Sequence, residues 1–126
     1  MANIEVMPVD LPLIDADHQQ FIGLLHQLAV ASNAEFPQLF AELQIITSQH
    51  FATEDALMLQ YAFPAIAEHS AEHQRVLNEF KQFKTRIDKG LIAFGRAFVQ
   101  ERLPQWFSLH VATMDSALAA HIKHLP

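Results

Sequence analysis

Two pairs of residues, each four positions apart, constrain the fold of this chain most strongly. His50 and Glu54 form the first pair, and His69 and His73 form the second. On an α-helix this spacing places both side chains of a pair on the same face. Each pair stands on an apolar stripe, where large hydrophobic residues are expected. Because a buried carboxylate is costly unless its charge is compensated, the pairs indicate helices that meet around a shared polar centre.

Helical periodicity runs through most of the chain and predicts an all-α fold. Apolar residues recur at helical spacing over about residues 17–32, 37–61, 65–88 and 91–122. Asp15 and Asp17 are candidate N-caps for the first segment, and Gly90 suits the end of the third. The connections are short, which favours an antiparallel up-down-up-down four-helix bundle. We expect one domain over residues 1–126, with an ordered N-terminal arm over residues 1–16.

The fourth helical segment contains two irregularities. Pro104 lies inside it and removes a backbone donor, so we expect a kink or the meeting of two helices there. Asp115 follows His110 by five positions. On a regular helix that offset turns the side chain by roughly 140°, so either the helix is locally widened or Asp115 reaches sideways.

Charge and composition exclude several classes of function. The net charge is −6 with no basic run, which argues against nucleic acid and against a basic membrane-binding helix. The chain has no cysteine, and therefore no disulfide and no thiolate metal site. It shows neither a secretory signal nor an apolar run of about 18 residues. We therefore expect a soluble cytoplasmic monomer.

Residues able to bind a metal stand on all four apolar stripes at one level of the expected bundle. In an antiparallel bundle, positions early in the first and third helices share a level with positions late in the second and fourth. Any one of these histidines alone is more often an ordinary core residue; it is the set at one level that favours a metal. The set is His18, His50, Glu54, His69, His73, His110 and Asp115.

The size and chemistry of this set suggest a particular metal. One ion rarely takes more than six ligands, so seven groups suggest two metals that share carboxylates. Nitrogen-rich ligation with carboxylate bridges suits iron better than magnesium or calcium, and zinc usually takes only four ligands. We leave His26, beside the first stripe, out of the set, and assign His121 and His124 to a solvated C-terminal end.

The spacings resemble those of the hemerythrin family, specifically the single-domain bacterial hemerythrins. The likeness covers nearly the whole chain and includes Phe63-Pro64 before the histidine pair and Trp106 four residues before His110. Phe63 stands where the family often has tyrosine, and Pro104 is unusual for the family. The motifs that carry the resemblance are Asp17-His18, His50 with Glu54, His69 with His73, and His110 with Asp115.

The resemblance implies a cofactor of two iron ions (Fe2+/Fe3+) with a bridging oxo or hydroxo group. Glu54 and Asp115 would bridge the irons. One iron would be held by His69, His73 and His110, and the other by His18 and His50, with one position open to O2. By position, an apolar wall around that ligand would consist of Phe21, Phe51, Trp106, Phe107 and Val111. Aromatic residues on a helix stripe are also ordinary core residues.

The function expected from this resemblance is reversible O2 binding for storage, delivery or sensing, without enzymatic activity. NO, azide or peroxide would occupy the same position. One alternative is a di-iron oxidase, peroxidase or NO-detoxifying enzyme. Ferritin-like di-iron sites use Glu-x-x-His spacing, which the ligating histidines here lack. Another alternative is a sensor module that passes an O2, redox or iron signal to a separate protein partner.

Overall fold

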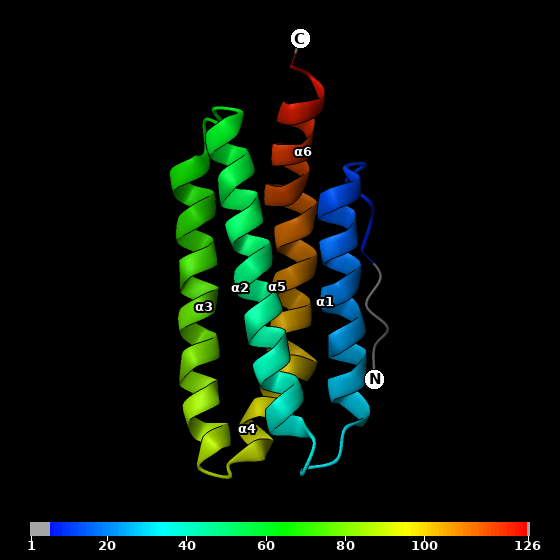
Figure 1. Ribbon diagram of the computed structural model, residues 1–126, viewed down its shortest axis with the longest axis vertical. Coiled ribbons are helices and arrows are strands. Elements are labelled where there is room, and N and C mark those ends of the chain that lie inside the picture. The colour runs from blue at the N-terminus through cyan, green and yellow to red at the C-terminus, as the bar shows by residue number, and fades with distance from the viewer. Residues whose placement is uncertain (1–5, 126) are drawn as a thin grey trace.

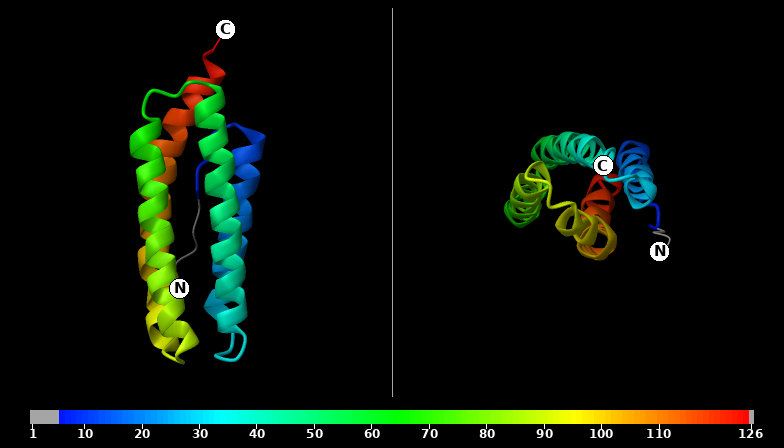
Figure 2. Two further views of the ribbon diagram at one scale, coloured as in Figure 1. Left: turned by 60° about the vertical axis from the view of Figure 1, so that its left-hand side comes forward. Right: turned by 90° about the horizontal axis from the view of Figure 1, so that it is seen from below.

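The computed structural model describes residues 6–125, which form four antiparallel helical columns (Figure 1). Seen end-on, the columns surround a common centre (Figure 2). The predicted all-α four-helix bundle is confirmed, and residues 6–125 contain no strand. The first three columns are α1 (Pro12–Val30), α2 (Phe36–Gln60) and α3 (Ile66–Asp88). The fourth consists of α4 (Ile92–Ala97), η1 (Phe98–Arg102), α5 (Leu103–His110), η2 (Val111–Asp115) and α6 (Ser116–Lys123).

The start of the first helix was predicted wrongly. α1 begins at Pro12 after the N-cap Leu11, which makes no side-chain capping bond, whereas we expected an arm to residue 16 capped by Asp15 or Asp17. Proline suits the first turn because its φ is already helical and its missing N–H would have no partner there. The Asp15 carboxylate instead accepts hydrogen bonds from the backbone N–H groups of Val9 (2.8 Å) and Asp10 (3.1 Å).

The arm packs onto the bundle over residues 6–11; residues 1–5 of the predicted arm lie outside the described part of the chain. Val9 is buried in the core. The Lys123 Nζ at the end of α6 donates a 2.8 Å hydrogen bond to the Val9 carbonyl. The arm is therefore joined both to α1, through Asp15, and to the last helix of the fourth column.

Phenylalanines fill the end of the bundle that contains the α1–α2 and α3–α4 connections. The ring of Phe80 on α3 lies 5.5 Å from that of Phe40 on α2 and 5.3 Å from that of Phe98 on η1, between ring centroids. All three are fully or almost fully buried. α4 lies close to α3 here, since a Cβ on Gly95 would lie 2.6 Å from Cδ1 of Ile87 on α3. Apolar burial of this kind supplies most of the stabilisation of a bundle.

The expected stop at Gly90 is confirmed. Gly90 has φ of +87°, a conformation that favours glycine. Its N–H bonds to the Ile87 carbonyl, and the Leu91 N–H bonds to the Arg86 carbonyl. These two bonds form a Schellman motif, which satisfies the last carbonyls of α3.

The fourth column continues past Pro104 without a break. A π-helical turn, η1, precedes it, and the proline lies in the first turn of α5. A proline ring clashes with the carbonyl four residues earlier in a regular helix. In η1 the Leu103 N–H bonds to the Phe98 carbonyl five residues earlier, so the backbone is widened by one residue just before Pro104. No helix among the described residues is long and apolar enough to cross a membrane.

Candidate metal centre

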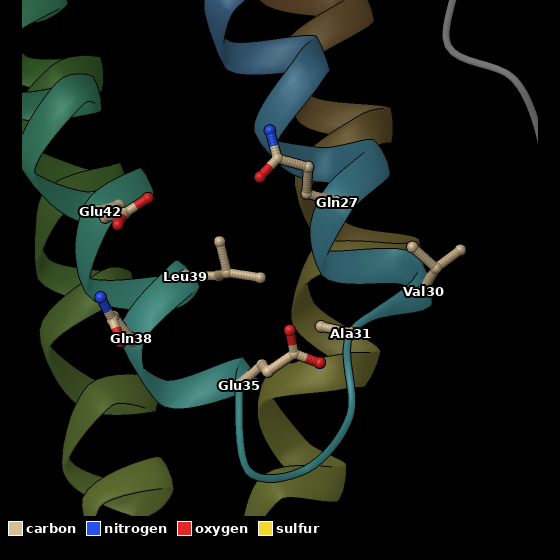
Figure 3. A pocket seen from close by; sticks show the side chains of 7 residues that line it. All are labelled: Gln27, Val30, Ala31, Glu35, Gln38, Leu39 and Glu42. Atoms are coloured by element: carbon tan, nitrogen blue, oxygen red, sulfur yellow. The ribbon is translucent and has the colours of Figure 1, made fainter.

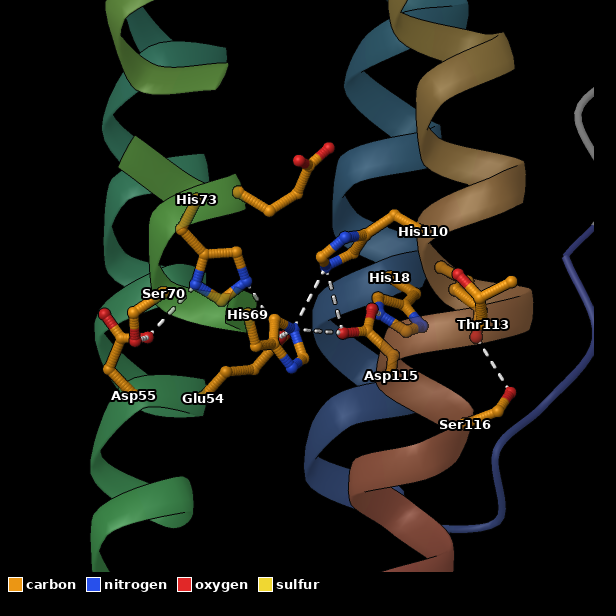
Figure 4. Close-up of polar contacts among 12 residues, drawn as sticks. His18, Glu54, Asp55, His69, Ser70, His73, His110, Thr113, Asp115 and Ser116 are labelled. Carbon is orange, nitrogen blue, oxygen red and sulfur yellow. Dashed lines mark hydrogen bonds and ion pairs between the residues drawn. The ribbon is translucent and has the colours of Figure 1, made fainter. Parts of the chain in front are cut away.

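All four columns direct side chains toward one level of the bundle (Figure 4). His18 lies on α1, His50 and Glu54 on α2, His69 and His73 on α3, and His110 and Asp115 on the fourth column. Each of the seven is buried, from His73 with 0% of its surface exposed to His50 with 9%. The structure thus brings the predicted set to one region of the core.

Five of these residues form a tight cluster, which we call the three-histidine half. Glu54 Oε1 lies 3.2 Å from Nε2 of His69 and 3.2 Å from Nε2 of His73. Asp115 Oδ1 lies 3.1 Å from Nε2 of His69 and 3.1 Å from Nε2 of His110. One candidate ligand atom from each residue lies within 4.8 Å of all the others. Ligand atoms about 2.1 Å from one ion, at right angles, stand about 3 Å apart, so this spacing suits a shared metal.

Several atoms at the centre of this cluster have no hydrogen-bond partner. Glu54 Oε1, Asp115 Oδ1 and His73 Nε2 are buried and unpaired, despite the short distances around them. A buried polar atom without a partner costs about 1–3 kcal/mol. A cation would satisfy all three, and their nitrogen and carboxylate chemistry suits iron. The residues therefore fit an iron site.

His18 and His50 form the two-histidine half, which is less closely gathered. His18 Nε2 lies 2.9 Å from Asp115 Oδ2, the second oxygen of a carboxylate in the cluster. His50 Nε2 instead lies 2.9 Å from the side-chain oxygen of Gln20 and 3.6 Å from Asp17 Oδ1. The nitrogen that His50 would offer to a metal is therefore already hydrogen-bonded to α1.

The five-residue offset between His110 and Asp115 is explained by a second π-helical turn. η2 spans Val111–Asp115, and the Ser116 N–H bonds to the Val111 carbonyl five residues earlier. In a π-turn, residues five apart take the place of residues four apart. Of the two alternatives left open by the sequence, the widened helix is correct, and it lets both side chains face the cluster.

A hydrogen bond outside the cluster orients one of its histidines. His73 Nδ1 lies 3.1 Å from Asp55 Oδ1, which also accepts a 3.0 Å hydrogen bond from Ser70 Oγ. A carboxylate on the outer ring nitrogen fixes the tautomer that leaves Nε2 free for a metal. Sequence reasoning missed both Asp55 and Gln20, because their partners lie on a neighbouring helix and no spacing within one helix reveals them.

Burial and mutual charge shift the acidities of the metal-free cluster. Burial and the neighbouring Asp115 charge raise the pKa of Glu54 to about 8. Burial opposes protonation of His69, but the Asp115 and Glu54 carboxylates beside its Nε2 outweigh burial and raise the pKa of His69 to about 9. Burial and the nearby His69 charge lower the pKa of His73 to about 4. Although burial opposes ionisation of Asp115, the His110, His18 and His69 rings beside its two oxygens hold its pKa well below the usual range.

A small cavity of about 20 Å³ adjoins both halves. Its polar lining includes His18, His50, Glu54, His110 and Asp115. Four of the five predicted wall residues line it, namely Phe21, Phe51, Trp106 and Phe107; Val111 is buried but does not line it. Thr47 also lines the cavity and was not predicted.

The aromatic wall is packed directly on the histidines. The Phe51 ring is parallel to that of His73, with centroids 3.9 Å apart. Trp106 stacks on His110 at 4.7 Å, and its Nε1–H donates a 2.7 Å hydrogen bond to Glu72. These contacts hold the rings in place and exclude water from that side of the cluster.

The remaining histidines divide as follows. His26 is exposed and His124 is exposed, as expected. The assignment of His121 to a solvated end is wrong. It is half-buried, its Nε2 donates a 2.7 Å hydrogen bond to the Tyr61 carbonyl, and its ring meets Phe63 at a centroid distance of 5.4 Å. His121 therefore joins the end of α2 to α6. This contact depends on how the two helices pack, so the sequence did not reveal it.

A surface pocket of about 400 Å³ lies between the end of α1 and the start of α2 (Figure 3). Its one carboxylate near the connection, Glu35, already accepts hydrogen bonds from the hydroxyl and the backbone N–H of Ser32. None of its lining residues belongs to the metal cluster; they are Gln27, Val30, Ala31, Glu35, Gln38, Leu39 and Glu42. The pocket is separate from the candidate site.

Comparison with known proteins agrees with this geometry. Residues 9–122 match the family model described as the hemerythrin HHE cation binding domain. This chain belongs to the hemerythrin family. The resemblance inferred from the motifs is thereby confirmed.

Named relatives within the hemerythrin family span most of the chain. It is 40% identical over 101 residues to a bacteriohemerythrin of Ralstonia nicotianae, covering 80% of this chain and 73% of the relative. It is 32% identical over 124 residues to a bacteriohemerythrin of Aquifex aeolicus, covering 94% of each. A myohemerythrin of Riftia pachyptila is 24% identical over 102 residues. No solved structure matches the chain significantly.

Proposed function

We propose that this protein is a di-iron hemerythrin that binds O2 reversibly. The observation that carries the proposal is the buried cluster of Glu54, His69, His73, His110 and Asp115, next to a cavity that His18 and His50 also line. Membership of the family supports the same function. Bound as a pair, the irons would supply the electrons for reversible O2 binding.

In this proposal each half of the site holds one iron. His69, His73 and His110 would hold the first, and His18 and His50 the second. The Glu54 and Asp115 carboxylates, together with an oxo or hydroxo group, would bridge the two. Asp115 suits a bridging role because its two oxygens lie near different halves: Oδ1 near His69 and His110, and Oδ2 near His18.

The side chains around the cavity would favour binding over turnover. Both carboxylates that line the cavity are proposed bridges, and Trp106 already donates its N–H to Glu72. Among the described lining residues, no further acid or base remains to move protons to a substrate. The apolar rings would slow loss of the bound ligand by excluding water. NO, azide and peroxide would enter the same cavity.

Spectroscopy of the iron-loaded protein tests the proposal. Metal analysis should find two irons per chain. After anaerobic reduction, exposure to air should produce a visible absorption band that disappears when O2 is removed. Immediate oxidation without such a band, or one zinc per chain, would contradict the proposal. A turnover assay with peroxide and a reducing substrate separates binding from peroxidase activity: an O2 carrier should show only slow background turnover.

A further inference from the structure

Thr47 differs from the other threonines of the chain. The hydroxyls of Thr53, Thr85 and Thr113 each donate to the carbonyl four residues earlier, at 3.1, 3.0 and 2.7 Å. This is the ordinary way for a helical threonine to satisfy its hydroxyl. Thr47 lies inside α2, is 1% exposed, and its Oγ1 has no hydrogen-bond partner. Its hydroxyl is therefore buried and unpaired.

Thr47 stands on the face of α2 that carries the candidate site. It precedes His50 by three positions and Phe51 by four, spacings that place side chains on one helix face. It lines the 20 Å³ cavity together with those two residues. A cavity needs about 10–15 Å³ to hold one water-sized molecule, so this one suits a ligand end of one or two atoms.

The other polar groups around the cavity are already engaged or assigned. Trp106 donates to Glu72, and the remaining polar lining residues are the proposed iron ligands. Among the described lining residues, the Thr47 hydroxyl is thus the unpaired donor that does not belong to a proposed iron ligand. Leaving such a group unpaired in a well-packed core is unfavourable, and a bound ligand with an accepting atom would pair it.

We infer that Thr47 contacts the ligand, and that its hydroxyl donates a hydrogen bond to the small molecule held in this cavity. The ligands favoured would be diatomic or linear triatomic molecules whose outer atom accepts a hydrogen bond, such as O2 and azide. The inference rests on the proposed function, since it requires a ligand beside the two-histidine half. It makes Thr47 a determinant of ligand affinity among otherwise apolar walls.

Azide titration of the oxidised, iron-loaded protein tests the inference. Thr47→Val removes the hydroxyl with little change of shape and should weaken azide binding about tenfold or more, as expected for a hydrogen bond to a charged ligand. Thr47→Ser keeps the hydroxyl and should bind nearly as wild type. Thr53→Val on the same helix removes a hydroxyl that bonds to Gln49 and should leave azide affinity unchanged.

The melting temperature of the metal-free protein provides a second readout. If Thr47 serves the ligand, Thr47→Val should melt at the wild-type temperature or higher, because an unpaired buried hydroxyl is removed. If its role is structural, or if it only holds an ordered water, azide affinity will match that of wild type, and the inference is wrong. Thr47→Ala is the second hydroxyl-free variant if Thr47→Val does not fold. Wild-type protein that binds neither iron nor azide would instead overturn the proposed function.

Discussion

The two halves of the candidate site differ in how far the protein alone assembles them. In the three-histidine half, nitrogen and oxygen atoms from α2, α3 and the fourth column stand 3.1 to 3.2 Å apart, and three of them have no hydrogen-bond partner. In the two-histidine half, His18 approaches the cluster through Asp115, whereas His50 is hydrogen-bonded to Gln20. The ligand atoms of the three-histidine half are thus already in position, whereas in the two-histidine half the His50 nitrogen is bonded to Gln20.

This difference implies an order of metal binding. Ligands that are already in position lose less conformational freedom on binding, so a preorganised site binds more tightly. The three-histidine half should therefore take the first iron, and the second should follow once His50 leaves Gln20. The cavity proposed for O2 adjoins both halves, so it would be complete only once the second iron is bound. Four predictions test this comparison, and they run from the largest expected effect to the smallest.

Glu54→Ala should abolish binding of both irons. Glu54 lies within reach of His69 and His73 and also lines the cavity beside His18 and His50, so its loss removes the proposed bridge between the halves. Metal analysis after iron loading should fall from two irons per chain to nearly none. Glu42→Ala changes an exposed carboxylate of the same helix and should retain two. Retention of both irons by Glu54→Ala would mean that the halves are independent.

His50→Ala should remove one iron and all O2 binding, while the three-histidine half keeps the other iron. His73→Ala should instead weaken the first and tighter site. Metal analysis with the anaerobic-to-air spectrum distinguishes the two results. His26→Ala is the control, because His26 is exposed on α1. If His50→Ala still binds O2, the open position belongs to the other half.

Stability of the metal-free protein should fall as the pH rises from 6.5 to 8. The pKa of Glu54 is raised from 4.5 to about 8, which favours its protonated form in the folded state; this contribution is lost as the pH rises through that range. The pKa of His69 is raised from 6.5 to about 9, so its contribution is present below 6.5 and is lost by about 9. Both groups act in the same direction between pH 6.5 and 8.

Iron should reverse this trend, because metal ligands must be deprotonated and metal binding strengthens with pH. Thermal melts of the metal-free and iron-loaded proteins across pH 6.5 to 9 measure both slopes. The metal-free melting temperature should decrease and the iron-loaded one should not. If the melting temperature of the metal-free protein does not change with pH, the pKa values of Glu54 and His69 are not raised in the folded state.

Gln20→Ala should have the smallest effect, a tighter second iron. Removing the 2.9 Å contact between Gln20 and His50 frees the nitrogen that would bind metal. A neutral hydrogen bond contributes about 0.5–1.5 kcal/mol, so the affinity of the second iron should rise about twofold to tenfold. Stepwise iron titration measures it. Gln27→Ala, an exposed glutamine further along α1, is the matched control; weaker second binding in Gln20→Ala would mean that Gln20 assists the site.

Most of the candidate site could be predicted because the spacing of its residues within single helices is a recognisable pattern. His50 with Glu54, and His69 with His73, stand on apolar stripes at a four-residue spacing. Helix geometry alone places both side chains of such a pair on one face. The start of α1 was misplaced because Asp15 resembles a cap, yet its carboxylate holds the backbone of Val9 and Asp10. Thr47 was not predicted because a single threonine on an apolar stripe forms no spacing pattern that indicates a function.

The sequence by itself determined the helices, their apolar faces and the level at which seven metal-competent side chains stand. These features follow from a helical period of 3.6 residues and from short connections that force antiparallel neighbours. Only the tertiary structure decided that the helix widens between His110 and Asp115, that Gln20 engages His50, and that Asp55 orients His73. The contacts of Gln20 and Asp55 depend on which atoms of separate helices come within hydrogen-bond distance, which no spacing along one helix encodes. The spacing of His110 and Asp115 left two alternatives, and the backbone bond from Ser116 to Val111 decides between them.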